Sequence, residues 1–586
     1  EETVISVTSM ICKSQWCQTE EDVQELAAFI LQVANNDLLL HSYLVDLLIE
    51  LDQKSDDKNQ LKKLIPFIVK KLFFSFGKTI TNCSFVYNLV KRNVITKEEL
   101  IEHLRELFVK IKMEVTPSFI RYSLAFGNDE ESYDDDDEED LIENDSDFEY
   151  NSTRFIFLWF FPEIIEMKLF CEPYINCDED EFVPFLKTFL PDKIEDYKKM
   201  RDKGEPEDEL TMSLRNDNVD KLQSIMSTTM NDSKQFVPFN IYEDFVPNGK
   251  TSYLNYAAAY GSIKCFKYLL LNHDKCDKST FSFATYGGNT EIIKIVDNYN
   301  QESFIDDSEN PSLKVKESDG SDYLIDDYGN FTKLLYVLYY EFDHRNSDLC
   351  KIIPSIMKHQ NDIFDWILEN KFTSNEINEE LFNNFLIISA HEGNVHSLIE
   401  IINKGFRLSR KMASRVFNVA SKKGFYRLSK IIYRTLDRQN HYHYYFNPFS
   451  SVSYGNLSIF KFSLNLKKSQ KGLQKAFVSA VLKDHKNITD YYFDKLLKEG
   501  FQFNFKCINK ALNFSVMKKS SEFFFYLLNK FIELPDLKFD YVEMFENDIL
   551  STACLHENYE AVKKIMELII TSIKNEQSSF NNSEYN

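Results

Sequence analysis

The stretch from Ser252 to Leu270, SYLNYAAAYGSIKCFKYLL, restricts the possible folds of this chain more than any other part of it. It begins with a face of small side chains, is interrupted at Gly261, and continues with an apolar stripe at helical spacing, formed by Ile263, Phe266, Leu269 and Leu270. This pattern predicts two short helices joined by a glycine. A glycine there can take the left-handed conformation that a β-carbon disfavours, and small side chains let the first helix lie close to a neighbour.

The two-helix pattern recurs through residues 207–574 at an average interval of about 34 residues. We call the residue between the two helices of each repeat the slot residue, and the slot residues are Asp217, Gly261, Gly288, His359, Gly393, Gly424, Gly455, Asp484, Lys519 and Glu557. The interval of 71 residues between Gly288 and His359 predicts two repeats, with part of the acidic stretch from Asn298 to Asn330 as a long surface insertion. Because no such repeat can bury its apolar face alone, the pattern predicts one stacked α-solenoid whose C-terminal repeats are degenerate.

The central stretch resembles the ankyrin repeat, whose signature runs T-P-L-H-x-A-A-x-x-G before an apolar second helix. Leu254, Ala257, Ala258 and Gly261 match this signature, whereas Ser252, Tyr253 and Asn255 stand where the family has Thr, Pro and His. Together with a helical, acid-interrupted N-terminal region, the loosely spaced repeats are similar to the large expanded ankyrin families of single-celled parasitic eukaryotes. The resemblance implies an all-α, ankyrin-type solenoid that binds proteins and carries no chemistry.

Composition shifts along the chain predict five regions. They are an N-terminal helical region (1–127), an acidic flexible loop (128–150), a helical connector (151–206), the degenerate ankyrin-repeat array (207–574) and a polar tail (575–586). Within the first region, Thr96 followed by Glu98 and Glu99 predicts a capped helix start. The acidic loop contains fourteen acids and no base, a density of like charge that cannot be buried.

The overall composition favours a helical protein inside the cell. Glycine (15) and proline (13) are scarce, which argues against an all-β fold with many tight turns, and 43% of the residues are hydrophobic. The ten cysteines form no C-x-x-C pair, so we expect reduced, mostly buried thiols and a cytoplasmic, possibly cytoskeletal, location. No apolar run is long enough to predict a membrane span or a membrane partner.

The residues expected of an enzyme or a metal site are present without the required spacing. The run from His391 to His396, HEGNVH, imitates a zinc-protease signature, but its histidines are five residues apart instead of four and flank a slot glycine. We therefore expect no catalytic residues, no cofactor, no metal and no small-molecule substrate.

Charge segregation is the main functional signal in the sequence. Between Lys404 and Lys483 there are seventeen bases and one acid, Asp437, within a chain of formal net charge −24. This segment predicts a basic face that binds an anionic partner in a salt-dependent way, although lysines on a merely solvated surface would give the same pattern. The residues expected to bind the partner are Arg407, Arg410, Lys411, Arg415, Lys422, Lys423, Arg427, Lys430 and Arg434.

Two functions are compatible with such a face. The first is a scaffold or adaptor that binds another protein, in particular a large assembly such as a cytoskeletal polymer. The second is a factor associated with RNA or a ribosome, in which Arg and Tyr side chains contact phosphates and bases. The chain has no RNP, KH or OB signature, and this favours the protein scaffold.

Overall fold

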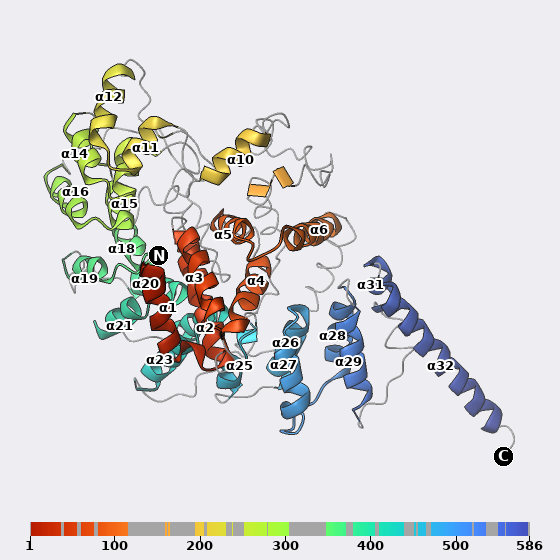
Figure 1. Ribbon diagram of the computed structural model, residues 1–586. Coiled ribbons are helices and arrows are strands. Elements are labelled where there is room, and N and C mark those ends of the chain that lie inside the picture. Colours follow the sequence, from red (N-terminus) through yellow and green to blue (C-terminus); the bar gives the residue numbers. More distant parts are fainter. Residues whose placement is uncertain are drawn as a thin grey trace, which may run out of the picture. The chain divides into compact units, whose positions relative to one another are not determined.

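The all-α class predicted from the sequence is confirmed, because every regular element in the described part of the chain is a helix (Figure 1). The computed structural model describes residues 2–36, 40–55, 60–74, 80–114, 159–160, 162–163, 194–203, 208–229, 237, 251–272, 274–277, 279–303, 347–370, 379–404, 410–438, 451–452, 455–464, 470–517, 521–534, 549–556 and 558–583. The acidic loop predicted at 128–150 lies outside these ranges. No helix within them combines the length and apolarity needed to cross a membrane. The chain divides into two compact units, Glu1–Phe406 and Arg407–Asn586.

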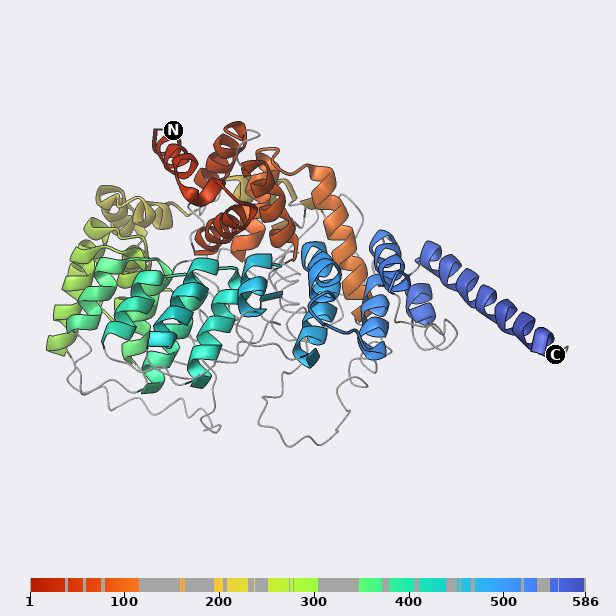
Figure 2. The same ribbon diagram turned by 90° about the horizontal axis from the view of Figure 1, so that it is seen from below.

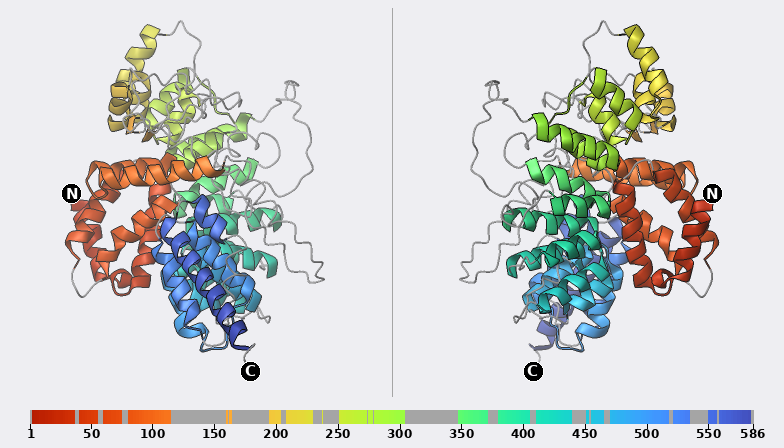
Figure 3. Two further views of the ribbon diagram at one scale, coloured as in Figure 1. Left: turned by 90° about the vertical axis from the view of Figure 1, so that its right-hand side faces the viewer. Right: turned by 90° about the vertical axis from the view of Figure 1, so that its left-hand side faces the viewer.

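The first unit begins with a helical bundle, red to orange in Figure 3, that has its own apolar core. Its α-helices are α1 (Glu2–Lys13), α2 (Glu20–Asn36), α3 (His41–Gln53), α4 (Leu64–Phe74), α5 (Ile80–Lys91) and α6 (Lys97–Glu114), and its short 3-10 turns are η1 (Gln15–Cys17) and η3 (Leu61–Lys63). The predicted cap of α6 is confirmed, since Glu99 N donates to Thr96 Oγ1 (3.1 Å) and Thr96 N donates to Glu99 Oε2 (2.8 Å). Reciprocal bonds of this kind fix where the helix starts.

A buried ion pair joins two parts of the predicted connector, and its arginine also contacts this bundle. Arg201, on α10 (Ile194–Lys203), donates to both carboxylate oxygens of Glu163 at 2.9 and 2.8 Å. Its guanidinium also lies 4.1 Å from the centroid of the Tyr87 ring on α5. Removing either charge would leave the other buried, so the pair holds α10 against the segment that carries Glu163, and the contact of Arg201 with Tyr87 ties α10 to the bundle.

Helical pairs make up the rest of the first unit. They are α11 (Glu209–Arg215) with α12 (Val219–Thr229), α13 (Tyr253–Ala259) with α14 (Ile263–Asn272), α15 (Thr280–Gly287) with α16 (Thr290–Ser303), α18 (Ser347–Met357) with α19 (Asn361–Asn370), and α20 (Glu379–Glu392) with α21 (Val395–Asn403). The first helices pack on one another in the order α11, α13, α15, α18, α20. Second helices pack likewise, α12 on α14, α14 on α16 and α19 on α21, so the pairs form a two-layered stack (Figure 2).

No repeat lies between α15 and α18 in the stack, and residues 304–346 of the interval predicted to contain two repeats lie outside the described residues. Helix α15 packs directly on α18, and Gln360 Nε2 donates to Tyr286 O (3.2 Å) across that junction. The prediction was wrong because it came from interval length alone, and length does not distinguish a stacked repeat from an insertion between neighbours.

The predicted slot positions are confirmed by backbone conformation wherever the structure describes them. All of these residues have positive φ, between 50° and 84°, and the set consists of Asp217, Gly261, Gly288, His359, Gly393, Gly424, Gly455 and Asp484. Lys519 and Glu557 lie outside the described residues. The left-handed residue turns the chain between the two helices of each pair.

At three slots, the residue that follows is an asparagine whose side chain bonds in two directions. Asn394 Oδ1 accepts from Ser397 N (3.1 Å) and so caps α21, while its Nδ2 donates to Ile356 O in the preceding pair (3.0 Å). A donation to the preceding repeat recurs from Asn289 to Gly261 O (2.9 Å) and from Asn558 to Val516 O (3.2 Å). Asn487, three residues after its slot and inside α27, also donates to Gly455 O (3.3 Å). One side chain therefore starts a helix and fixes its distance from the preceding repeat.

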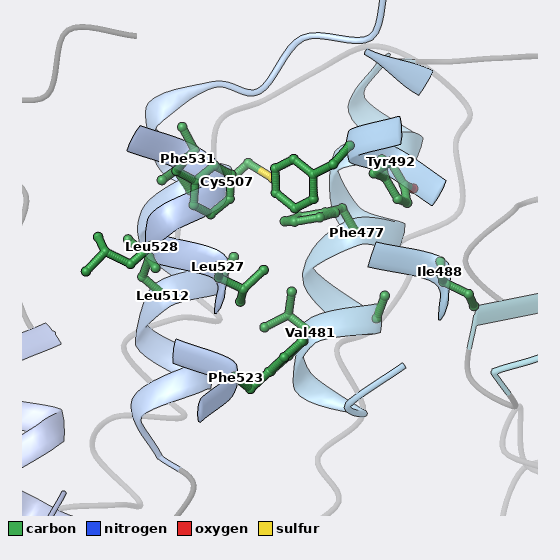
Figure 4. Close-up of a cluster of buried hydrophobic side chains, with 14 of the residues drawn as sticks. Phe477, Val481, Ile488, Tyr492, Cys507, Leu512, Phe523, Leu527, Leu528 and Phe531 are labelled. Atoms are coloured by element: carbon green, nitrogen blue, oxygen red, sulfur yellow. The ribbon is translucent and has the colours of Figure 1, made fainter. Parts of the chain in front are cut away.

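The second unit continues the pairing. Its helices are α22 (Arg410–Lys423), α23 (Tyr426–Arg438), α25 (Leu457–Leu464), α26 (Gln470–Leu482), α27 (Lys486–Tyr491) continued by the π-helical turn η6 (Tyr492–Leu496), α28 (Phe505–Val516), α29 (Glu522–Ile532), α31 (Ile549–Leu555) and α32 (Tyr559–Ser583). Helix α28 packs between α26 and α31. Figure 4 shows the core between these pairs, where Phe477, Tyr492 and Phe531 meet. Most of the predicted polar tail, 575–586, is helical, because α32 ends at Ser583.

We expect Gly287→Ala to destabilise the first unit by about 1–3 kcal/mol, because overpacking forces neighbouring backbone apart. A Cβ at this position would lie 2.1 Å from Ala258 O and 2.9 Å from Ala259 O, where α15 touches the small-residue face of α13. Thermal unfolding followed by circular dichroism measures the effect. A Gly287→Ala protein that melts at the same temperature as the parent would contradict the close packing of α15 on α13.

We expect Asn394→Ala to lower stability by about 1–3 kcal/mol, since it removes a helix cap and one of the two hydrogen bonds that Ile356 O accepts, and leaves only the bond from His359 N (3.2 Å). Asn218→Ala is the matched control, because Asn218 is exposed and caps Lys221 N (3.1 Å). Denaturant unfolding of both variants should show the larger loss for Asn394→Ala. Equal losses would mean that the bond between repeats contributes nothing.

Candidate functional site

The predicted basic face is carried by the helical pair α22 and α23. Gly424, with φ 84°, turns the chain between them, and Phe425 behind it is 1% exposed. Val416 and Phe417 of α22 and Leu428 of α23 are buried, which fixes the inner side of the pair. The basic side chains therefore occupy the remaining outer side of each helix.

The structure places most of the predicted binding residues on these two helices. Arg427, Lys430 and Arg434 follow one another at spacings of three and four residues along α23, so they form one stripe. Arg434 is exposed, whereas Arg415, Lys422, Lys423, Arg427 and Lys430 are half-buried. Half-buried bases keep their charged ends near solvent while their aliphatic stems pack on the helix. Arg410 and Lys411 lie in the first turn of α22, with side chains outside the described part, and Arg407 lies outside the described residues altogether.

Aromatic rings connect this stripe to the next helix of the unit. Phe462 of α25 lies edge-on to Tyr426 and Tyr433 of α23, with ring centroids 6.4 and 5.4 Å apart, and 6.3 Å from Phe417 of α22. Lys430 Nζ is 4.0 Å from the centroid of the Tyr426 ring. A cation near a ring face is attracted by its quadrupole, so the bases and the rings form one surface.

Contacts between lysine and tyrosine continue along the second helices of the following pairs. Lys461 of α25 and Lys495 of η6 lie 5.4 and 5.5 Å from the Tyr491 ring, and Lys486 of α27 lies 5.0 Å from the Tyr526 ring of α29. We call this set the Lys–Tyr row; its members are Tyr426, Lys430, Lys461, Lys486, Tyr491, Lys495 and Tyr526. All of its tyrosines are half-buried, so each ring keeps an accessible side.

Acidic groups join the row at α27. The Tyr526 hydroxyl donates to Asp490 Oδ1, and burial together with Asp490 and Asp494 raises the pKa of that hydroxyl. Lys495 Nζ is 3.8 Å from Glu499 Oε1. The surface is therefore most basic on α22, α23 and α25, and mixed in charge from α27 onward.

Sequence reasoning missed the aromatic part of this surface. Phe462, Tyr491 and Tyr526 were not among the expected binding residues, because charge was counted without regard to which helix of a pair carried it. A usable signal was present, since Tyr491 and Tyr526 occupy second helices about one repeat apart.

The histidines that imitate a zinc signature have separate partners. His391 Nδ1 lies 2.7 Å from Glu392 Oε1 at the end of α20, whereas His396 Nε2 on α21 lies 2.9 Å from each carboxylate oxygen of Asp365. The two imidazoles thus lie on different helices and contact different carboxylates. No group of three potential metal ligands occurs among the described residues.

One buried histidine contacts a serine hydroxyl. His41 Nδ1 lies 2.9 Å from Ser84 Oγ, and its Nε2 lies 2.7 Å from Ala34 O. A nucleophilic triad needs a carboxylate at the second nitrogen, and here that position is taken by a backbone carbonyl. His41 is 1% and Ser84 5% exposed, so the contact ties α2, α3 and α5 together in the bundle.

Comparison with known proteins does not assign the chain to a family: no protein-family model matches it, and no curated protein matches it. Its function therefore has to be inferred from the basic face and the Lys–Tyr row.

We expect Phe462→Ala to loosen α23 from α25, because the ring contacts aromatic side chains from both neighbouring helices. Aromatic pairs contribute roughly 0.5–1.5 kcal/mol each beyond the area they bury, so hydrogen exchange in α23 should accelerate about tenfold or more. Phe462→Leu keeps most of the apolar volume and serves as the control. Unchanged exchange in the alanine variant would exclude Phe462 as the link between these helices.

Proposed function

We propose that residues 207–574 form a degenerate ankyrin-type array and that the chain is a non-enzymatic scaffold or adaptor. The observation that carries the proposal is the positive φ at every described slot residue, non-glycine ones included. A left-handed turn between two short helices, followed by a capping residue that bonds to the preceding repeat, supports an ankyrin-type organisation. Stacked repeats of this kind expose extended faces suited to binding other macromolecules.

We infer that the basic face binds an anionic surface of a protein partner, such as a large assembly of the cytoskeletal kind. Side chains from α22 and α23 supply positive charge, and Phe462 and the Lys–Tyr row add half-buried rings beside it. Exposed ion pairs contribute little individually, so affinity should come from several contacts together. The rings add apolar and cation–π contact area that a purely solvated lysine surface lacks.

The test is reversal of Lys422, Lys423, Arg427 and Lys430 to Glu in the full chain. We expect the variant to lose at least about tenfold in affinity for an acidic polypeptide probe, polyglutamate, measured by fluorescence anisotropy. Raising salt from about 50 to 300 mM should weaken binding of the parent protein similarly.

The matched control reverses four exposed lysines elsewhere, Lys264, Lys294, Lys498 and Lys563, and so changes net charge equally. Equal losses in both quadruple variants would mean that only net charge matters. Circular dichroism and melting of each variant separate lost binding from lost folding.

An RNA-associated function is the second candidate, and the half-buried tyrosines of the row favour it, since bases stack on such rings. Affinity for single-stranded RNA, measured beside polyglutamate, and a lysate pull-down with and without RNase discriminate the two. If the partner is lost on RNase treatment, the RNA-associated function replaces the protein scaffold as the proposal.

A further inference from the structure

The C-terminal helix α32 extends beyond the helix on which it packs. It covers Tyr559–Ser583, whereas its neighbour α31 covers only Ile549–Leu555 (Figures 1 and 2). Ala561 and Ile565, both fully buried, anchor its N-terminal half in the core of the second unit. The rest of the helix is therefore held mainly by this first part.

A stripe of apolar side chains faces away from that anchor. Tyr559 is 75% exposed, Met566 42%, Ile570 46% and Ile573 41%. Their spacings of seven, four and three residues place them on one side of the helix, in the pattern of a coiled-coil seam. Large apolar side chains grouped in this way mark an interaction surface more often than isolated ones do.

Two opposite charges flank the stripe. Glu567 and Lys574 are both exposed and lie seven residues apart, so they occupy the same side of α32. Against a parallel copy of the helix, these off-seam side chains of the two copies would lie on opposite faces of the pair, and no contact between Glu567 and Lys574 of different copies would form. Against an antiparallel copy, Glu567 of each copy faces Lys574 of the other copy.

The same antiparallel arrangement matches the apolar side chains. A two-fold axis near Ile570 pairs Glu567 of each copy with Lys574 of the other. The same axis brings Met566 of each copy close to Ile573 of the other, and the two Ile570 side chains meet at the axis. Self-complementarity of this kind is what a closed, isologous dimer requires.

We propose that α32 is a self-association surface, on which a second copy of this chain packs antiparallel through Met566, Ile570 and Ile573, with Glu567 and Lys574 at the rim. The seam is short, so the interface belongs to the small, weak class, and the dimer should dissociate on dilution through concentrations on the order of micromolar. Within the copy itself, Glu567 Oε2 lies 3.9 Å from Lys564 Nζ, an exposed contact that is weak enough to be exchanged.

The first test is sedimentation velocity on the full chain over a range of concentrations. We expect a monomer–dimer equilibrium for the parent protein and a monomer at all concentrations for Ile570→Glu, which buries charge at the axis. Lys498→Glu, an exposed lysine outside α32, is the control and should behave as the parent does. A parent protein that stays monomeric, or a dimer that survives Ile570→Glu, would overturn the proposal.

The second test fixes the orientation. Glu567→Lys and Lys574→Glu, each alone, should weaken the dimer by about tenfold, because two attractive contacts become repulsive. Mixing these two variants should restore association by forming the mixed dimer, and so should combining both changes in one chain. Single variants that associate as well as the parent would exclude the antiparallel arrangement, and unchanged melting curves would show that the fold is not the cause.

Discussion

The stacking of this protein depends on a left-handed residue between helices and on the hydrogen bonds made around it. A positive φ costs a non-glycine residue of order 1 kcal/mol or more, yet Asp217 and His359 adopt it. Both side chains bond to the next repeat: Asp217 Oδ1 accepts from Lys264 N (2.8 Å) and Cys265 N (3.0 Å), and His359 Nε2 lies 3.0 Å from Glu392 O. Contacts between repeats thus offset the strain within one, which explains why the slot tolerates residues other than glycine.

Because each pair bonds mainly to its neighbours, surface features repeat along the same layer of helices. Second helices align from α23 through α25 and α27 to α29, and this alignment brings lysines and tyrosines from different repeats into contact. A partner that binds along this layer would meet similar chemistry at successive repeats. Its affinity would then depend on how many repeats it spans, since each contact alone is weak.

The helical class and the slot positions were predictable because they depend on local patterns, namely apolar spacing and a residue suited to positive φ. Two features were not. The count of stacked repeats failed between Gly288 and His359, because adjacency of α15 and α18 is a property of packing. The ring of Phe462 at the basic face was missed because it contacts residues about 30 to 45 positions earlier, a separation that sequence periodicity alone does not convert into proximity. Lys422 is half-buried whereas Arg434 is exposed, and this difference likewise depends on the neighbouring side chains.

Gln32 of α2 donates from Nε2 to Glu392 Oε2, and both side chains are buried although 360 residues separate them. During synthesis at roughly 5–20 residues per second, the partner of Gln32 is added about 20–70 s after Gln32 itself. Because domains generally fold as units, N-terminal first, we expect the bundle to fold on its own core before α20 is synthesised. Gln32 would then offer a polar group on a preformed surface for Glu392 to bind.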